Sequence, residues 1–297
     1  MAAYTVLIPL DGSPLAEHSL TYLQALSKMG DLAVHLLSVV DETEEIHDLT
    51  STEVVERESH VLTTYLNQIT ADVERVLGLK ATPEVRVGVP MEAIEKHAAE
   101  LKPDLMVIST HGRSGLSRWR HGSVAARLLH AASCPILIVG PKAAGEWRKG
   151  VSAPTFDSIL VPLDGSELAE GALNTAAEIS QAHGSKIHLV RTVRLRVAGD
   201  PATGAASIDL TTQLEEGAAS YLAKIRERLV AGGDVVAEVR MGAPATELEE
   251  YISKEGINLV VMTSHGRSGL VRAALGSVTD RLAGNGNAPV LIVRSPN

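Results

Sequence analysis

The chain has 297 residues, enough for two domains of ordinary size, and 45% of these residues are apolar. A net charge of −9 and an aromatic content of 3% argue against a nucleic-acid partner, which usually meets a basic face with aromatic side chains for base stacking. The sequence contains no apolar run of membrane-spanning length, and its single cysteine, Cys134, excludes an intramolecular disulfide framework. We therefore expect a cytoplasmic protein without a signal peptide and without nucleic-acid or membrane partners.

The predicted elements of the first half alternate between strands and helices. Residues 5–9 form a short continuous apolar run, which is typical of a strand buried on both faces. Ser13 and Pro14 have the pattern of a helix N-cap followed by proline at the first helical position, so we expect a helix that continues to residue 26. The remaining strands are expected at residues 32–40, 83–87, 104–109 and 135–139, and the remaining helices at residues 52–77, 91–101 and about 123–131.

The second half of the chain repeats the first almost completely. The segment VLIPLDGS at residues 6–13 returns as ILVPLDGS at residues 159–166, and PILIV at residues 135–139 returns as PVLIV at residues 289–293. Alternating strands and helices imply right-handed crossovers and a parallel sheet covered on both faces. We therefore expect an α/β fold with two tandem, open, five-stranded parallel sheets of the Rossmann-like type. We assign residues 1–141 to the first domain, the Gly-, Ala-, Lys- and Pro-rich residues 142–155 to a linker, and residues 156–297 to the second domain.

A glycine-rich loop follows the fourth predicted strand in each half. The sequence STHGRSGL at residues 109–116 returns as TSHGRSGL at residues 263–270, and each copy is followed by a Gly-Ser-Val segment after the same interval. Glycines let the backbone approach a ligand closely, and a helix start adds amides and partial positive charge, so such a loop can hold phosphate. Asp11 and Asp164 follow the first strand of each half and are expected to share one crevice with these loops, because parallel sheets bind ligands at their carboxyl edge. The expected ligand is a nucleotide di- or triphosphate.

Taken together, these motifs resemble those of the universal stress protein family. The resemblance spans nearly the whole chain, which looks like a tandem member with two fused domains. It implies an ATP site with the pattern G-x2-G-x9-G-[S/T], in which Gly112 and Gly122 supply the second and third glycines of the first copy. The chain departs from that pattern at the first glycine, where Ser109 and Thr263 stand and add a hydroxyl.

The resemblance also implies which residues bind the nucleotide. Asp11 and its repeat contact the ribose or a metal ion, the end of the second strand offers backbone groups to adenine, and the loops and helix starts hold the phosphates. The residues expected to bind the cofactor in the first half are Pro9, Leu10, Asp11, Val39, Ser109, Gly112, Arg113, Gly115, Gly122, Ser123, Val124 and Ala125. Those expected in the second half are Pro162, Leu163, Asp164, Thr192, Thr263, Gly266, Arg267, Gly269, Gly276, Ser277, Val278 and Thr279. We expect ATP, with ADP and AMP as alternatives and Mg²⁺ carried by the nucleotide, and no metal site built from protein side chains.

Several classes of enzyme are disfavoured by missing motifs. The sequence contains no P-loop pattern, no dinucleotide-binding G-x-G-x-x-G after the first strand, no nucleophile elbow and no H-E-x-x-H helix. We therefore expect no catalytic residues and, at most, slow ATP hydrolysis. The favoured function is an ATP-binding stress-response regulatory protein, and the alternatives are a weak ATPase or autophosphorylating protein and a ligand-free dimerisation scaffold. The resemblance further implies that the last strands, residues 136–139 and 290–293, pair the two halves within one chain, and we expect a homodimer beyond that.

Overall fold

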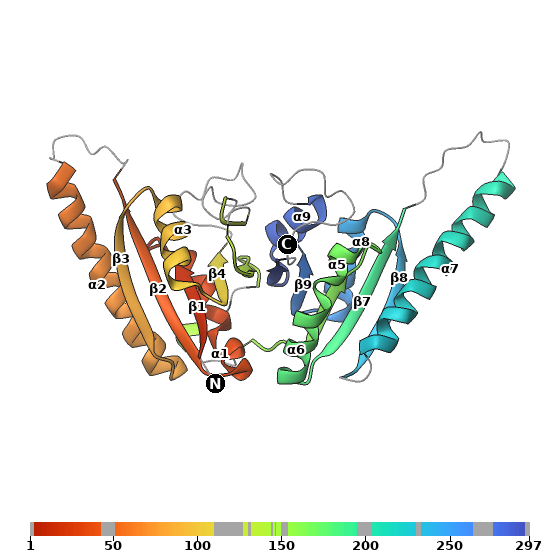
Figure 1. Cartoon of the computed structure of the whole chain (residues 1–297), viewed down its shortest axis with the longest axis horizontal. Helices are drawn as coiled ribbons and strands as arrows, with labels where there is room; N and C mark the ends of the chain where they lie inside the picture. The colour runs from red at the N-terminus through yellow and green to blue at the C-terminus, as the bar shows by residue number, and fades with distance from the viewer. Residues whose placement is uncertain are drawn as a thin grey trace. The chain divides into compact units, whose positions relative to one another are not determined.

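The computed structural model describes residues 3–42, 51–109, 127–129, 132–143, 145, 147–149, 154–194, 204–229, 233–263 and 276–294. They divide into two compact units: Met1–Thr155 with Ala283–Arg294, and Phe156–Leu282 with Ser295–Asn297. Each unit is built from a β-sheet with helices packed against it (Figure 1). The α/β fold predicted from the sequence is thereby confirmed.

The sheet of the first unit contains the five strands of the first half. They are β1 (Tyr4–Pro9), β2 (Leu32–Asp41), β3 (Ala81–Gly88), β4 (Leu105–Ser109) and β5 (Ile136–Val139), and they lie in the order β3-β2-β1-β4-β5. Every neighbouring pair among them is parallel. The last strand of the chain, β10 (Val290–Val293), belongs to the same compact unit and runs antiparallel to β5, with Val290 opposite Ile138.

The second unit repeats the arrangement with the strand order β9-β6-β7-β8, in which all pairs are parallel. Its strands are β6 (Ser158–Pro162), β7 (Lys186–Val193), β8 (Val235–Met241) and β9 (Leu259–Thr263). Its helices are α5 (Glu167–Glu170), α6 (Leu173–His183), α7 (Gly204–Leu229) and α8 (Pro244–Glu255), and α9 (Ser277–Asn285) precedes β10.

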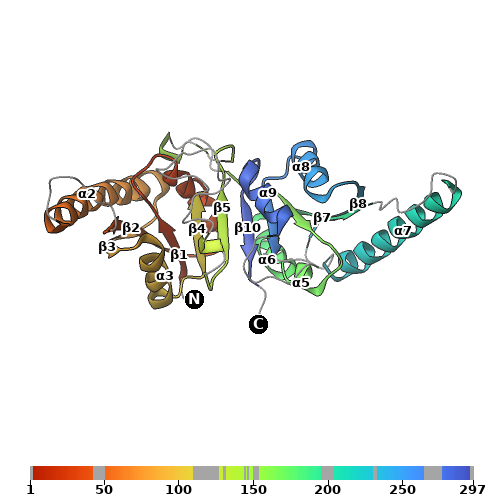
Figure 2. The ribbon, with the colours of Figure 1, turned by 90° about the horizontal axis from the view of Figure 1, so that it is seen from above.

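The helices lie on opposite faces of each sheet, as right-handed crossovers require. In the first unit, α2 (Ser51–Leu77) and α3 (Pro90–Leu101) cover opposite faces, and in the second unit α7 and α8 do the same (Figure 2). The central strands are therefore buried on both sides, and the runs Val6–Ile8 and Ile159–Val161 are inaccessible to solvent. Among the described residues, no helix combines the length and the apolar character that crossing a bilayer requires.

The helix predicted from Ser13 to residue 26 is wrong in type. The chain instead forms a turn, the 3-10 helix η1 (Ala16–Tyr22), the short helix α1 (Leu23–Leu26) and a second 3-10 segment, η2 (Ser27–Met29). The Ser19 hydroxyl donates to the Ala16 carbonyl oxygen, three residues earlier, at 2.6 Å, a contact that favours the tighter turn. The matching position of the second half is Ala172, which has no hydroxyl; it lies in a short turn after α5, and the longer α-helix α6 begins directly after it.

Candidate functional site

The ends of the first and fourth strands of each half lie side by side. β1 and β4 pair in parallel, and their register, continued along the strands, places Leu10 opposite Ser109. The same continuation of the β6 and β9 pair places Leu163 opposite Thr263. The strand order reverses at this point, and this is the place where parallel α/β sheets bind ligands. Leu10 and Leu163 are each only 3% exposed, so they can offer a ligand their backbone but not their side chains.

A tight turn built on an aspartate follows the first strand of each half. Asp11 accepts a hydrogen bond at its Oδ1 from the backbone nitrogen of Ser13 at 2.9 Å. Asp164 accepts at Oδ1 from the backbone nitrogen of Ser166 at 3.0 Å and from its hydroxyl at 2.6 Å. In both turns the intervening glycine has a positive φ, 81° in the first half and 87° in the second. These hydrogen bonds fix the carboxylates at the crevice, so a structural role in the turn and a contact with a ligand are compatible.

The second strand of each half extends beyond the first. β1 pairs with β2 as far as Pro9 opposite Leu37, so Val39 lies two residues past the paired stretch. In the second half the pairing ends at Pro162 opposite Val190, and Thr192 stands at the equivalent place. The backbone of each extension therefore borders the crevice, where it can donate to and accept from a planar heterocycle. The adenine contacts expected at these two positions stay a prediction.

The second helix-start segment, residues 276–279, is described in the structure. α9 begins at Ser277, and the backbone nitrogen of Asp280 donates to the Gly276 carbonyl oxygen at 2.9 Å, which closes its first turn. Thr279 is buried at 2% exposure, so its side chain packs inside the fold, and what it can offer at the surface is backbone. A helix start after a glycine is the local geometry that suits an anion.

The sequence profile of the Universal stress protein family matches residues 4–140 and again residues 155–294. The chain belongs to the universal stress protein family.

Relatives of this universal stress protein cover either one half of the chain or most of it. A universal stress protein of Methanocaldococcus jannaschii is 30% identical over 143 residues, which are 48% of this chain and 84% of the relative. A universal stress protein of Mycobacterium tuberculosis is 27% identical over 222 residues, which are 74% of this chain and 70% of the relative. The crystal structure of a universal stress protein from Archaeoglobus fulgidus superposes with a TM-score of 0.73 over 99% of this chain and 97% of its own, at 19% identity, and shows the shared fold.

Much of the predicted phosphate-binding part of this universal stress protein lies outside the described residues. These positions are Gly112, Arg113, Gly115, Gly122, Ser123, Val124, Ala125, Gly266, Arg267 and Gly269. Ser109 and Thr263, which occupy the family's first glycine position, are the last residues of β4 and β9. Their roles, like those of the loops that follow, stay predictions.

Beside the turn of the second half, the structure places a cation that the sequence analysis missed. The guanidinium of Arg191 on β7 lies 4.8 Å above the ring of Tyr221 on α7. A Cβ atom at Gly165 would lie 3.0 Å from the same guanidinium, which would have to shift slightly, and the positive φ of Gly165 would strain any other residue. The Tyr221 hydroxyl donates to Glu170 at 3.1 Å, and burial together with the Glu170 charge raises the pKa of that hydroxyl. The first half carries Ser38 in place of Arg191, and the Ser38 hydroxyl donates to the Leu10 carbonyl oxygen at 2.7 Å.

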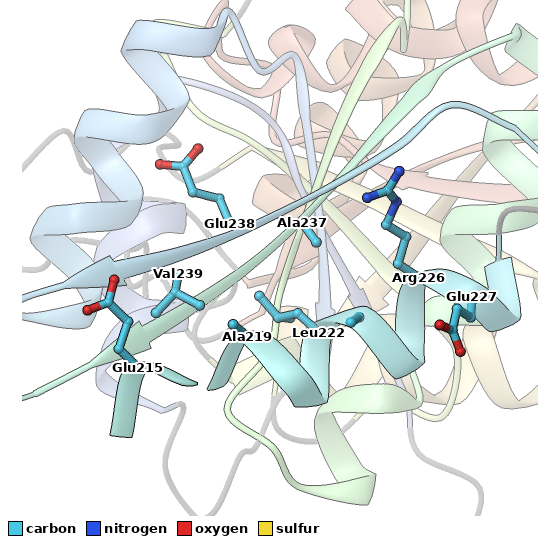
Figure 3. Close-up of a pocket in the computed structure, with 9 residues that line it drawn as sticks. Glu215, Ala219, Leu222, Arg226, Glu227, Ala237, Glu238 and Val239 are labelled. Carbon is cyan, nitrogen blue, oxygen red and sulfur yellow. The ribbon is translucent and has the colours of Figure 1, made fainter. Parts of the chain in front are cut away.

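Away from the strand ends, the second unit contains a cavity of about 740 Å³ between α7 and β8 (Figure 3). Its described lining combines small apolar side chains with a charged rim, and includes none of the predicted cofactor-binding residues. The lining residues are Glu215, Ala219, Leu222, Ala223, Arg226, Glu227, Ala237, Glu238 and Val239. The described ranges contain no group of three His, Cys, Asp or Glu side chains arranged to hold a metal ion.

Each unit contains a buried histidine outside the candidate site, His97 in the first and His188 in the second. His188 shares hydrogen bonds with the Tyr251 hydroxyl at 2.9 Å and with the Ser158 hydroxyl at 3.1 Å. Burial lowers the pKa of His188, and burial also raises the pKa of Tyr251 to about 12. In the first unit, burial lowers the pKa of His97 on α3. Both imidazoles are therefore neutral at neutral pH.

Proposed function

We propose that this universal stress protein binds an adenine nucleotide, ATP foremost, at the strand-end crevice of each half and acts as a stress-response regulatory protein without strong catalytic activity. The observation that carries the proposal is the meeting of three strand ends at one place. β1 ends in the aspartate turn, β4 ends beside it at Ser109, and β2 runs on past β1 to Val39. The second half repeats all three features.

This geometry supports separate contacts for the adenine, the ribose and the phosphates of the nucleotide. The backbone beside Val39 and Thr192 offers hydrogen-bonding groups to the edge of adenine, and the aspartate turns offer carboxylates to the ribose hydroxyls. The start of α9 at Ser277 offers backbone amides and the positive end of a helix dipole to phosphate oxygens. ADP and AMP satisfy the same adenine and ribose contacts, and Mg²⁺ accompanies the triphosphate.

A regulatory role rests on occupancy and not on turnover, and we propose that hydrolysis is slow. We also propose that the two halves pair through their last strands and that the cytoplasmic protein forms a homodimer. The antiparallel register of β10 against β5 supports the first of these statements.

The decisive experiment measures nucleotide directly. Freshly purified protein is denatured, the released small molecules are identified by mass spectrometry, and the emptied protein is titrated with ATP, ADP and AMP by calorimetry. We expect adenine nucleotide close to two per chain, loss of one site in Gly112→Val and loss of the other in Gly276→Val. Gly217→Ala, on the exposed surface of α7, is the matched control and should retain both sites.

Each other outcome contradicts a part of the proposal. Absence of nucleotide and of binding heat would favour a ligand-free scaffold. Rapid conversion of added ATP to ADP would favour the weak-ATPase alternative.

A further inference from the structure

The segment that leads out of the first half is bound to that half. We call residues 141–143, 145 and 147–149 the strap. The Tyr22 hydroxyl of η1 donates to the Ala143 carbonyl oxygen at 2.8 Å, and Thr21 exchanges hydrogen bonds with the backbone of Gly145 at 3.3 Å. Trp147, at the start of η3 (Trp147–Lys149), is 8% exposed. The strap therefore packs against η1, although its composition is that of a linker.

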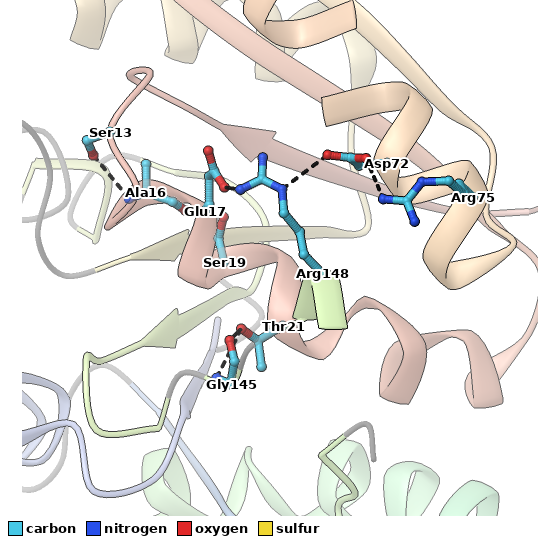
Figure 4. A network of polar contacts seen from close by, with 9 residues as sticks. All are labelled: Ser13, Ala16, Glu17, Ser19, Thr21, Asp72, Arg75, Gly145 and Arg148. Carbon is cyan, nitrogen blue, oxygen red and sulfur yellow. Dashed lines mark hydrogen bonds and ion pairs between the residues drawn. The ribbon is translucent and has the colours of Figure 1, made fainter. Parts of the chain in front are cut away.

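Arg148 is the polar anchor of the strap. Its guanidinium pairs with the Glu17 carboxylate on η1, and its Nε donates to Asp72 on α2 at 3.1 Å (Figure 4). Arg75 holds the other oxygen of Asp72 at 2.7 Å, and hydrogen bonds from Arg75 and then Arg148 lower the pKa of Asp72. Glu17 is only 8% exposed, so its charge needs a nearby cation. Arg148 supplies this cation and joins η1 to α2.

The second unit makes the same connection without a strap. Glu170 repeats Glu17, and Arg228 of α7 occupies the position that repeats Asp72. Arg228 pairs directly with Glu170 at 2.9 Å. In the second unit, α7 itself carries the cation that pairs with the glutamate. In the first unit, Arg148 supplies this cation from the strap, which follows the five strands of the first half.

The 3-10 helix η1, which Arg148 holds at Glu17, follows directly on the aspartate turn of the candidate nucleotide site. Asp11 accepts from the Ser13 nitrogen, the Ser13 hydroxyl accepts from the Ala16 nitrogen at 3.1 Å, and Glu17 follows. Figure 4 shows Ser13, Ala16 and Glu17 leading from this turn to Arg148. The charges of Glu17 and Asp11 both reach the Tyr65 hydroxyl and, together with burial as the main cause, raise its pKa. The strap anchor and the aspartate turn therefore act on the same short segment.

We propose that Arg148 is a positioning residue for the first nucleotide site, and that the strap couples occupancy of this site to the segment leading to the second half. This inference rests on the proposed nucleotide binding. If the strap holds η1 and its preceding turn in the binding geometry, removing the anchor weakens binding. By thermodynamic reciprocity, bound nucleotide then tightens the strap.

The first test measures ATP affinity in a Gly276→Val background, in which only the first site remains. Arg148→Ala is expected to weaken binding about tenfold, within the usual range of coupling between sites. Asp72→Arg added to Arg148→Ala recreates the Glu170–Arg228 arrangement of the second unit and is expected to restore affinity. Arg75→Ala, which removes the other partner of Asp72 and leaves Glu17 paired, is the matched control and should bind as the background does.

The second test needs no variant. Hydrogen exchange of the strap amides in the full-length protein is followed with and without saturating ATP, and ATP is expected to slow exchange at Ala143, Gly145 and Arg148. A strap that is only structural would show the same exchange in both samples, and that result would overturn the inference even if Arg148→Ala failed to fold. Unchanged affinity in a folded Arg148→Ala protein would overturn it as well. If the unaltered protein bound no ATP at all, the proposed function would be the part that failed.

Discussion

Nδ1 of His97 on α3 lies 3.5 Å from Oε1 of Glu84 on β3, and the imidazole is 5% exposed. Burial is the main reason that the pKa of His97 is lowered, and the nearby Arg86 and His35 act in the same direction, whereas Glu84 and Glu100 oppose them. In the unfolded chain the pKa returns to about 6.5. The unfolded state therefore binds more protons between the lowered pKa and about 6.5, and stability falls as the pH decreases through this window.

We expect His97→Tyr to reduce this acid sensitivity. Tyrosine stands at the matching position of the second half, as Tyr251, and does not titrate in this range. The free energy of unfolding, measured with urea at pH 7.5 and 5.5, should drop less for the variant than for the unaltered protein. His60→Gln, at an exposed position on α2, is the control and should follow the unaltered protein. Equal losses in all three proteins would contradict the assignment.

Gly140 and Gly286 approach each other closely in the first unit. A Cβ atom at Gly140 would fall far inside van der Waals contact with the Cα atom of Gly286. Gly140→Ala is therefore expected to destabilise the protein by about 1–3 kcal/mol, the usual cost of overpacking. Gly217→Ala in α7 meets no atom within 4 Å and should instead stabilise by about 0.5–1 kcal/mol, because alanine is the better helix former. Thermal unfolding of the two variants should shift in opposite directions.

Cys134 precedes β5 and is 6% exposed, and burial raises the pKa of its thiol. The thiolate is the reactive form, so we expect negligible reaction with a chromogenic disulfide reagent at pH 7 in the folded protein. One thiol per chain should react after denaturation in urea, and Cys134→Ala should give none in either state. Rapid reaction of the folded protein would mean that the site opens readily.

The register of β10 against β5 can be tested with paired cysteines. Val290 lies opposite Ile138, so Ile138→Cys with Val290→Cys, in a Cys134→Ala background, is expected to form a disulfide on mild oxidation. If both strands belong to one chain, the product migrates as a monomer in a non-reducing gel. Ile136→Cys with Val290→Cys is out of register, since Ile136 lies opposite Ile292, and should not cross-link. A cross-linked dimer would instead assign the pairing to two chains.

Local sequence patterns were sufficient to predict the strands of the sheet. Val6–Ile8 and Ile159–Val161 are uninterrupted apolar runs in a chain that alternates strands with helices, and continuous burial on both faces follows directly. The repeat then placed Asp164 and Thr263 by analogy with the first half. The prediction of an α-helix after Ser13 was wrong because the Ser19 hydroxyl bonds the Ala16 carbonyl oxygen, three residues earlier. Helical periodicity in the sequence does not reveal this effect.

The long-range polar contacts could not be read from the sequence. Arg148 and Glu17 are 131 residues apart, and Arg148 lies in a segment whose composition indicates a linker. Arg191 follows an apolar strand pattern, and its stacking on Tyr221 depends on how α7 crosses β7. One feature of the repeat could have indicated these contacts. Glu17 and Tyr65 both recur in the second half, as Glu170 and Tyr221, whereas Arg228 stands in place of Asp72.

The source of the cation that pairs with Glu17 and with Glu170 also decides where the chain can be divided into fragments. A fragment ending at residue 141 would retain Glu17 without Arg148, whereas a fragment beginning at residue 156 keeps Glu170 together with Arg228. An N-terminal fragment that keeps this ion pair should therefore extend at least to residue 149. What looks like a tether between duplicated halves is, on this reasoning, the closing part of the first one.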